Sequence, residues 1–187
     1  MSIDKAPKPA NPVLIDRVLA SLQDTLIEKL SWLDFAFGRA QRLVTKKENR
    51  DFYYPGIYTG AKEYKNVLPG EQNGNFCFFV VSDPQAVEYK QHQRNTLKSP
   101  FSLVFWYNLD KIYPDTNERR TEEIKLEILR TLTDAILTEG RITIATIFEQ
   151  AENIYKGYSL KEIDNQFLMH PFAGLRIEGE IIVKEPC

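Results

Sequence analysis

The side chains that could carry out chemistry in this chain are few and lie far apart in the sequence. The two histidines are His92, in a polar stretch, and His170, directly before a proline. Neither has a second His, Cys or carboxylate at the spacing of a metal site, so we expect no bound metal. Cys77 lies within an apolar run, where a buried, inert thiol is expected. Cys77 and Cys187 are too far apart to form a disulfide scaffold.

Sequence signatures of phosphate binding and nucleophilic catalysis are also missing. Gly70 and Gly74 bracket polar residues, but no Lys-Ser/Thr pair follows them as it does in a P-loop. No G-x-S-x-G and no dinucleotide-binding pattern occurs. Glu123 and Glu127 share a helix face, but basic residues surround them, which favours a solvated charged face. We therefore predict no enzymatic activity and no cofactor, with an enzyme of an unrecognised type as the alternative.

Basic residues provide the remaining local signal, in two groups. One group crowds a predicted hairpin tip, and the other marks a long polar stretch. Aromatic residues are not interleaved with either group, so sequence-specific nucleic-acid recognition is not favoured. Both groups are interpreted as solvated loops or, alternatively, as contacts to acidic partner surfaces or to passing DNA backbone. The candidate partner-contacting residues are Arg42, Lys46, Lys47, Arg50, Lys90, His92, Arg94 and Lys98.

The composition is that of a globular protein. The 187 residues are 43% hydrophobic and 27% charged, with a net charge of −2 that gives no general attraction to nucleic acid or anionic membrane. No apolar run approaches the roughly 20 residues of a membrane span, and no secretory signal is apparent. The aromatic fraction of 12% suits sheets and protein interfaces. We expect a reduced, cytoplasmic environment.

Two long amphipathic helices are predicted within a single domain over positions 11–187. Positions 1–10 contain two prolines and predict a flexible N-terminal arm. Asn11-Pro12 is typical of a helix start, and an apolar stripe follows to about Leu33. A second helix is predicted from Asn117 to Thr138.

The strands are predicted from apolar runs and from period-2 alternation. A strand over Phe35 to Val44, interrupted at Gly38, and another over Phe52 to Thr59 predict a hairpin with a polar tip. Phe76 to Ser82 and Phe101 to Leu109 are buried-strand patterns. Between these two lies a polar loop of about 17 residues, Asp83 to Ser99.

The C-terminal stretch carries the clearest alternation in the chain. Gly174 to Val183 predicts a closing strand, with Leu175, Ile177, Ile181 and Val183 on one side and Arg176, Glu178, Glu180 and Lys184 on the other. Ser159 and Glu162 predict a capping box that opens a short helix, and Arg141 to Phe148 predicts a further strand. The fold class that follows is α+β, a mixed, mostly antiparallel sheet packed by two long helices, with a projecting hairpin and a long loop.

In element order and in the run ENIYKGYSLKEIDNQFLMHPFAGLRIEGEIIV, the chain resembles the tail terminator (tail completion) proteins of long-tailed bacteriophages. In residues, the resemblance covers roughly Gly140 to Val183. The family pattern is an N-terminal helix, a hairpin, a strong strand, a long helix, a short strand and a final strand.

This resemblance implies a virion structural protein that is assembled in the host cytoplasm. It would form a homo-oligomeric ring, a hexamer, on the head-proximal end of the tail tube. The ring would stop tube polymerisation and bind the neck or head completion protein. DNA would pass through the ring without specific binding, and no membrane would be involved. Another phage neck, tail or baseplate component, or a soluble cellular protein-interaction domain, are the alternatives.

Overall fold

One sheet organises the chain. The computed structural model describes residues 4–60, 62–89, 91, 94–115, 118–137, 140–161 and 163–185. Within them, the strand order is β3-β2-β1-β4-β6-β8-β7, and β5 pairs with β6 off this path. The strands are β1 (Phe35–Lys47), β2 (Arg50–Gly60), β3 (Glu63–Asn66), β4 (Phe76–Val81), β5 (Ala86–Glu88), β6 (Thr96–Asn108), β7 (Gly140–Phe148) and β8 (Phe172–Lys184).

The helical elements of the described residues are short apart from two. They are α1 (Ile15–Lys29), α2 (Leu109–Ile112), α3 (Thr121–Asp134), α4 (Ala151–Ile154) and the 3-10 turns η1 (Glu71–Asn73) and η2 (Asn165–Leu168). All strand pairs are antiparallel except β1 with β4, which is parallel. The predicted α+β class with a mixed, mostly antiparallel sheet is confirmed.

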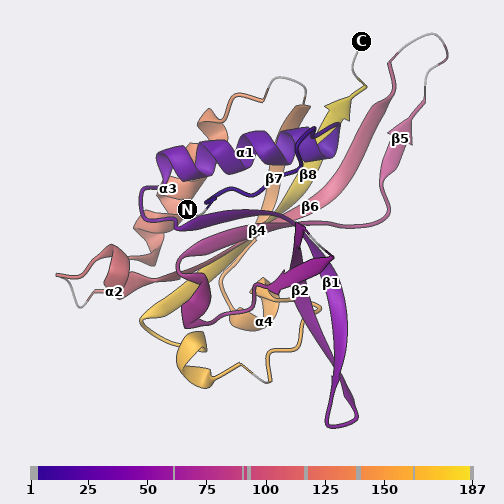
Figure 1. The fold of residues 1–187 in the computed structure, drawn as a ribbon. Coiled ribbons are helices and arrows are strands. Elements are labelled where there is room, and N and C mark those ends of the chain that lie inside the picture. The colour runs from indigo at the N-terminus through magenta and orange to yellow at the C-terminus, as the bar shows by residue number, and fades with distance from the viewer. Residues whose placement is uncertain are drawn as a thin grey trace.

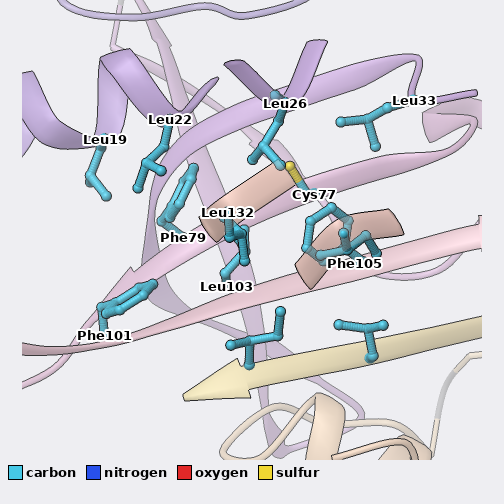
Figure 2. Packing of buried hydrophobic residues seen from close by; sticks show 14 of the residues in the cluster. Leu19, Leu22, Leu26, Leu33, Cys77, Phe79, Phe101, Leu103, Phe105 and Leu132 are labelled. Atoms are coloured by element: carbon cyan, nitrogen blue, oxygen red, sulfur yellow. The ribbon is translucent and has the colours of Figure 1, made fainter. Parts of the chain in front are cut away.

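The core has two parts, one on each face of the sheet. On one face, α1 and α3 pack against β4, β6 and β8, as Figures 1 and 2 show. The alternating apolar side chains that were predicted on one side of the final strand lie in this cluster: Leu175, Ile177, Ile181 and Val183. On the other face, Phe76, Phe78 and Trp106 pack with Ile154 and Tyr155 at α4. The central strands β4 and β6 are therefore buried on both faces, which explains their continuous apolar sequences.

Both long helices are shorter than predicted. The first begins at Ile15 rather than at Pro12, because Leu14 has a φ of 50° that interrupts the helical path, and it ends at Lys29. The second spans Thr121–Asp134. In each helix, the residues that extend the apolar stripe beyond these limits continue the chain toward a strand instead.

The predicted hairpin has longer strands and a tighter turn than expected. Only Glu48 and Asn49 separate β1 from β2, with φ values of 48° and 61°. This is the left-handed geometry that two-residue hairpin turns require. The polar residues assigned to the tip therefore lie within the strands, apart from Glu48 and Asn49. The interruption predicted at Gly38 is a register shift against β4, between Ala36 and Arg39, and β1 continues through it.

The predicted long loop, Asp83 to Ser99, contains two paired strand segments, β5 (Ala86–Glu88) and the start of β6. β6 begins at Thr96 rather than at Phe101, and β5 pairs with its first residues. This extension forms because β8 pairs with β6 as far as Lys184↔Thr96. Backbone hydrogen bonding to a long neighbour makes a strand here even though the sequence is polar. We call this β5–β6 extension the upper ribbon, and it leaves the body of the sheet in Figure 1.

The predicted capping box does not open a helix. The Ser159 hydroxyl accepts a hydrogen bond from the Tyr53 N–H at 3.0 Å, and Glu162 lies outside the described residues. The helical turn comes later, at Asn165–Leu168, where the Asp164 side chain accepts from the Gln166 N–H. The short helix α4 was not predicted.

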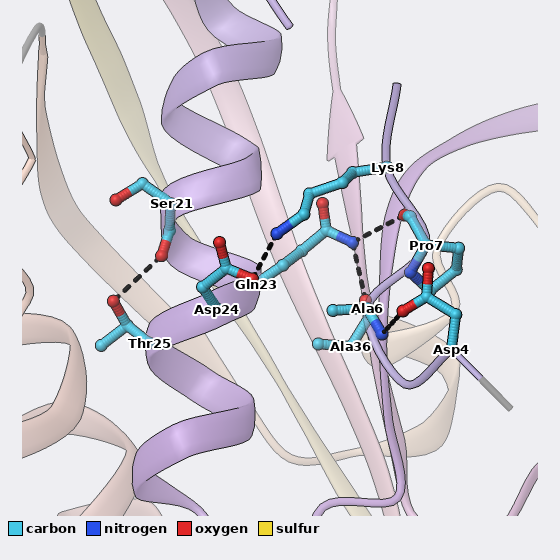
Figure 3. Close-up of polar contacts among 9 residues, drawn as sticks. All are labelled: Asp4, Ala6, Pro7, Lys8, Ser21, Gln23, Asp24, Thr25 and Ala36. Atoms are coloured by element: carbon cyan, nitrogen blue, oxygen red, sulfur yellow. Dashed lines mark hydrogen bonds and ion pairs between the residues drawn. The ribbon is translucent and has the colours of Figure 1, made fainter. Parts of the chain in front are cut away.

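The N-terminal arm, predicted to be flexible, lies against α1 and β1 from residue 4 on. Figure 3 shows Gln23 of α1 at the centre of these contacts: its Nε2 donates to the carbonyls of Pro7 (2.9 Å) and Ala36 (2.7 Å). The Ala36 N–H donates to the Lys5 carbonyl at 2.8 Å, and Lys8 forms an ion pair with Asp24. The Gln23 amide is buried, so it holds the arm by hydrogen bonds that water does not compete for.

Replacing Gln23 by Ala tests this attachment. The substitution leaves two carbonyls without their donor and is expected to cost roughly 1–3 kcal/mol of arm docking. Trypsin should then cut after Lys5 faster than in the unmodified protein. Asp24→Ala is the matched control, since an exposed ion pair contributes little. Equal cleavage rates in Gln23→Ala and the unmodified protein would show that this amide does not hold the arm.

Ile177→Asp tests the placement of β8. An unpaired carboxylate among buried apolar residues is expected to cost roughly 3 kcal/mol or more, enough to unfold a marginal domain. Lys184→Asp, at an exposed position of β8, is the control and should leave thermal unfolding nearly unchanged. A folded Ile177→Asp protein with near-normal melting would contradict the placement.

Candidate interaction surfaces

The basic residues predicted as partner contacts fall into two separate places. Arg42, Lys46, Lys47 and Arg50 lie on the β1–β2 hairpin, and Arg94 and Lys98 lie at the upper ribbon. Lys90 and His92 lie outside the described residues. The hairpin tip and the upper ribbon extend from different ends of the molecule in Figure 1. The candidates therefore do not form one basic surface.

Arg42 has a structural role. Its Nε donates to the Gly157 carbonyl at 2.8 Å, and its guanidinium lies 3.7 Å from the centre of the Tyr53 ring. The backbones of Tyr53 and Ser159 also bond to one another, with the Ser159 N–H donating to the Tyr53 carbonyl at 2.8 Å. Residues 154–159 thus form a segment fastened to the hairpin. We call this segment the strap.

The strap is held at its other end by a buried arginine. Arg176 of β8, predicted on the side of the strand opposite its apolar residues, is 7% exposed. Its guanidinium donates to the Ser102 hydroxyl at 2.7 Å, to Glu178 at 2.9 Å and to the Ile154 carbonyl at 3.4 Å. Because each group is paired, the buried charge is compensated. Arg176 thus joins β6, β8 and the strap.

The three remaining hairpin cations are exposed at its tip. Lys46 lies opposite Asp51, and Lys47 lies opposite Arg50. The Lys47 ammonium lies 4.6 Å from the centre of the Phe52 ring. An aromatic ring therefore accompanies one of these cations, although no aromatic residue is interleaved with them in sequence. The tip therefore presents three exposed cations, one opposite an acidic residue and one beside an aromatic ring.

On the upper ribbon, Lys98 is paired within the chain. It forms an ion pair with Glu88 and donates a hydrogen bond to the same carboxylate. This hydrogen bond raises the pKa of the Lys98 ammonium above its usual value. Arg94 is exposed. Charge density in the sequence predicted that these residues lie at the surface, but it could not show which of them already have an internal partner.

A broad open hollow lies where β1 diverges from β4. Its walls include Gly38 to Arg42 of β1, Val80 to Asp83 and the strap, with Arg176 and Glu178 of β8. Arg39 and Lys156 are exposed at its rim. Tyr158 lies within it, and burial raises the pKa of its phenol, opposed by the charges of Arg176 and Arg42.

The exposed edge of β7 is a surface that the sequence did not indicate. Residues 143–146 are all exposed, and Ile144 is 37% exposed. Beside it, an open groove of mixed polarity is lined by residues that include Leu132, Ala135, Ile142 and Arg141. Ile136, just beyond the C-terminus of α3, is 83% exposed. Edge position is a property of sheet order, so no local pattern in β7 could have revealed it.

Cys77 is buried as predicted, and burial raises the pKa of its thiol. Among the described residues, no group of three or more His, Cys, Asp or Glu side chains could hold a metal ion. None of the described helices is long and apolar enough to cross a membrane. No model of a known protein family matches the chain, and no curated protein matches it.

Arg42→Ala tests the strap. Loss of the Gly157 hydrogen bond and the Tyr53 contact should cost roughly 1 kcal/mol and loosen residues 155–159. Hydrogen–deuterium exchange in this segment should become faster. Lys46→Ala removes a cation from the same strand without touching the strap and should leave exchange unchanged. Unaltered exchange in Arg42→Ala would remove Arg42 from this structural role.

Proposed function

We propose that this protein is a virion structural protein that acts by self-assembly, as a tail terminator of a long-tailed phage. It forms a ring, a hexamer as the resemblance implies, on the head-proximal end of the tail tube. There it stops polymerisation of the tail tube protein and binds the neck or head completion protein. It assembles in the host cytoplasm, becomes part of the virion and has no catalytic activity.

The observation that carries this proposal is the open edge of β7. Along this strand of nine residues, the backbone N–H and C=O groups that do not bond to β8 point outward, and no described strand pairs with them. An edge of this length readily pairs with another chain, so stable subunits either cover it or use it. Assembly into a closed ring covers the edge in every subunit at once.

Two further features suit a ring that contacts the tail tube on one side and the neck or head completion protein on the other. α1 and α3 act as the two long helices that pack one face of the sheet. The β1–β2 hairpin acts as a projecting arm whose exposed tip carries Lys46, Lys47 and Arg50. A passing DNA backbone or an acidic face of a tail partner would be attracted to such cations without base contacts.

The test combines assembly with tube growth. The purified protein should elute as a ring of about six subunits when its mass is measured by light scattering. Added to polymerising tube protein, it should yield tubes that stop growing, measured by electron microscopy. A stable monomer that leaves tube length unchanged would overturn the proposal and favour a cellular interaction domain.

A paired variant separates the two activities. Lys46→Glu with Arg50→Glu reverses the exposed charge of the hairpin tip without touching the sheet edge. This variant should keep the mass of the ring but bind tube or neck partner more weakly. Lys184→Glu, an exposed reversal elsewhere, is the control. Partner binding equal to that of the unmodified protein would exclude the tip as a contact.

A further inference from the structure

The upper end of the sheet has two unpaired edges. There the strands lie in the order β5-β6-β8-β7, with Ala86, Lys98, Ile182 and Arg141 in one row. The outer edge of β5 and the outer edge of β7 have no strand partner among the described residues. All three pairings are antiparallel, so β5 and β7 run in opposite directions.

We propose that β5 of one subunit adds to the outer edge of β7 in a second copy of this chain. Rotation about an axis only moderately tilted from the strands largely keeps strand direction, so it brings β5 antiparallel to β7 of the neighbour. The contact joins two different edges and is therefore heterologous, as a ring requires. This inference rests on the proposed self-assembly and specifies the surfaces that would carry it.

The side chains define one register. Val87 pairs with Leu97 and Ile142 pairs with Ile181, so Val87 and Ile142 belong to the helix-covered face of the sheet. Glu88 and Arg141 belong to the opposite face. An antiparallel pairing with Ile142 opposite Val87 therefore places Arg141 opposite Glu88 and Thr143 opposite Ala86. Apolar meets apolar on one face, and opposite charges meet on the other.

Each of these contacts serves a group that is incompletely covered in a single subunit. Val87 is 61% exposed, and Ile142 is only partly buried. Arg141 is exposed and has no ion-pair partner in the part of the chain that the structure describes. Glu88 already binds Lys98, so the neighbour's Arg141 would extend this pair into a row of alternating charge.

The register also suits a closed assembly. Within one subunit Arg141 is level with Ala86, whereas across the contact it is opposite Glu88. Each subunit is thus displaced along the strands by two residues relative to the next. Closed sheets need such a stagger, because it accompanies the tilt of their strands.

Disulfide trapping tests the pairing. In a Cys187→Ser background, where Cys77 is buried, Val87→Cys and a differently tagged Ile142→Cys protein are co-expressed and oxidised. We expect a cross-linked species that contains one chain of each kind. Neither variant alone should cross-link to itself. Glu88→Cys with Arg141→Cys provides a second pair on the opposite face, in case Ile142→Cys disturbs folding.

Val87→Cys with Thr143→Cys is the matched negative control, since these side chains belong to opposite faces. A ring of normal mass that gives no cross-link with either expected pair would overturn the edge pairing and leave the proposed function standing. Self-cross-linking of Ile142→Cys would show a symmetric β7–β7 contact and would also overturn it. Cross-linked rings that fail to stop tube growth would support the pairing and contradict the tail terminator role.

Discussion

The pairing of β6 with β8 is the interaction on which the rest of the molecule depends. Each strand has 13 residues, and they pair from Thr96↔Lys184 to Asn108↔Phe172. β4 and β5 attach to the other edge of β6, and β7 attaches to the other edge of β8. Pro100 has no backbone N–H to donate. It lies between the residues of β6 that pair with β4 and those that pair with β5, so no hydrogen bond to either strand is lost. This long pair positions both core clusters and both open edges.

The sequence predicted strands correctly where burial of one face makes apolar side chains alternate. It did not predict strand residues that are held by backbone pairing alone. Leu175, Ile177, Ile181 and Val183 alternate because one face of β8 packs on helices. The hairpin tip is polar on both faces, and the start of β6 has the single apolar residue Leu97 among polar ones, so no periodic pattern marks either as a strand. Arg176 was misplaced because its charge favours solvent unless three partners from distant elements compensate it, and periodicity cannot reveal such partners.

The candidate surfaces were predictable to a similar extent. Charge density identified exposed residues such as Lys46 and Arg50. It could not separate them from Arg42 and Lys98, which are bound within the chain. The unpaired edge of β7 depends on the order of strands in the sheet, which long-range pairing determines. The resemblance to tail terminators supplied the functional proposal, and the open edges give that proposal a physical basis.

The strap has a mechanical consequence for the hairpin. β1 pairs with β4 only between Phe35 and Arg39, so most of the hairpin extends beyond this short region of pairing. Arg42–Gly157 and the paired backbones of Tyr53 and Ser159 brace it part-way along its length. A sideways load on the tip is therefore transmitted through the strap and Arg176 into β8. These contacts shorten the part of the hairpin that is free to move. The tip can therefore bend while the residues near β4 keep a fixed direction relative to the sheet.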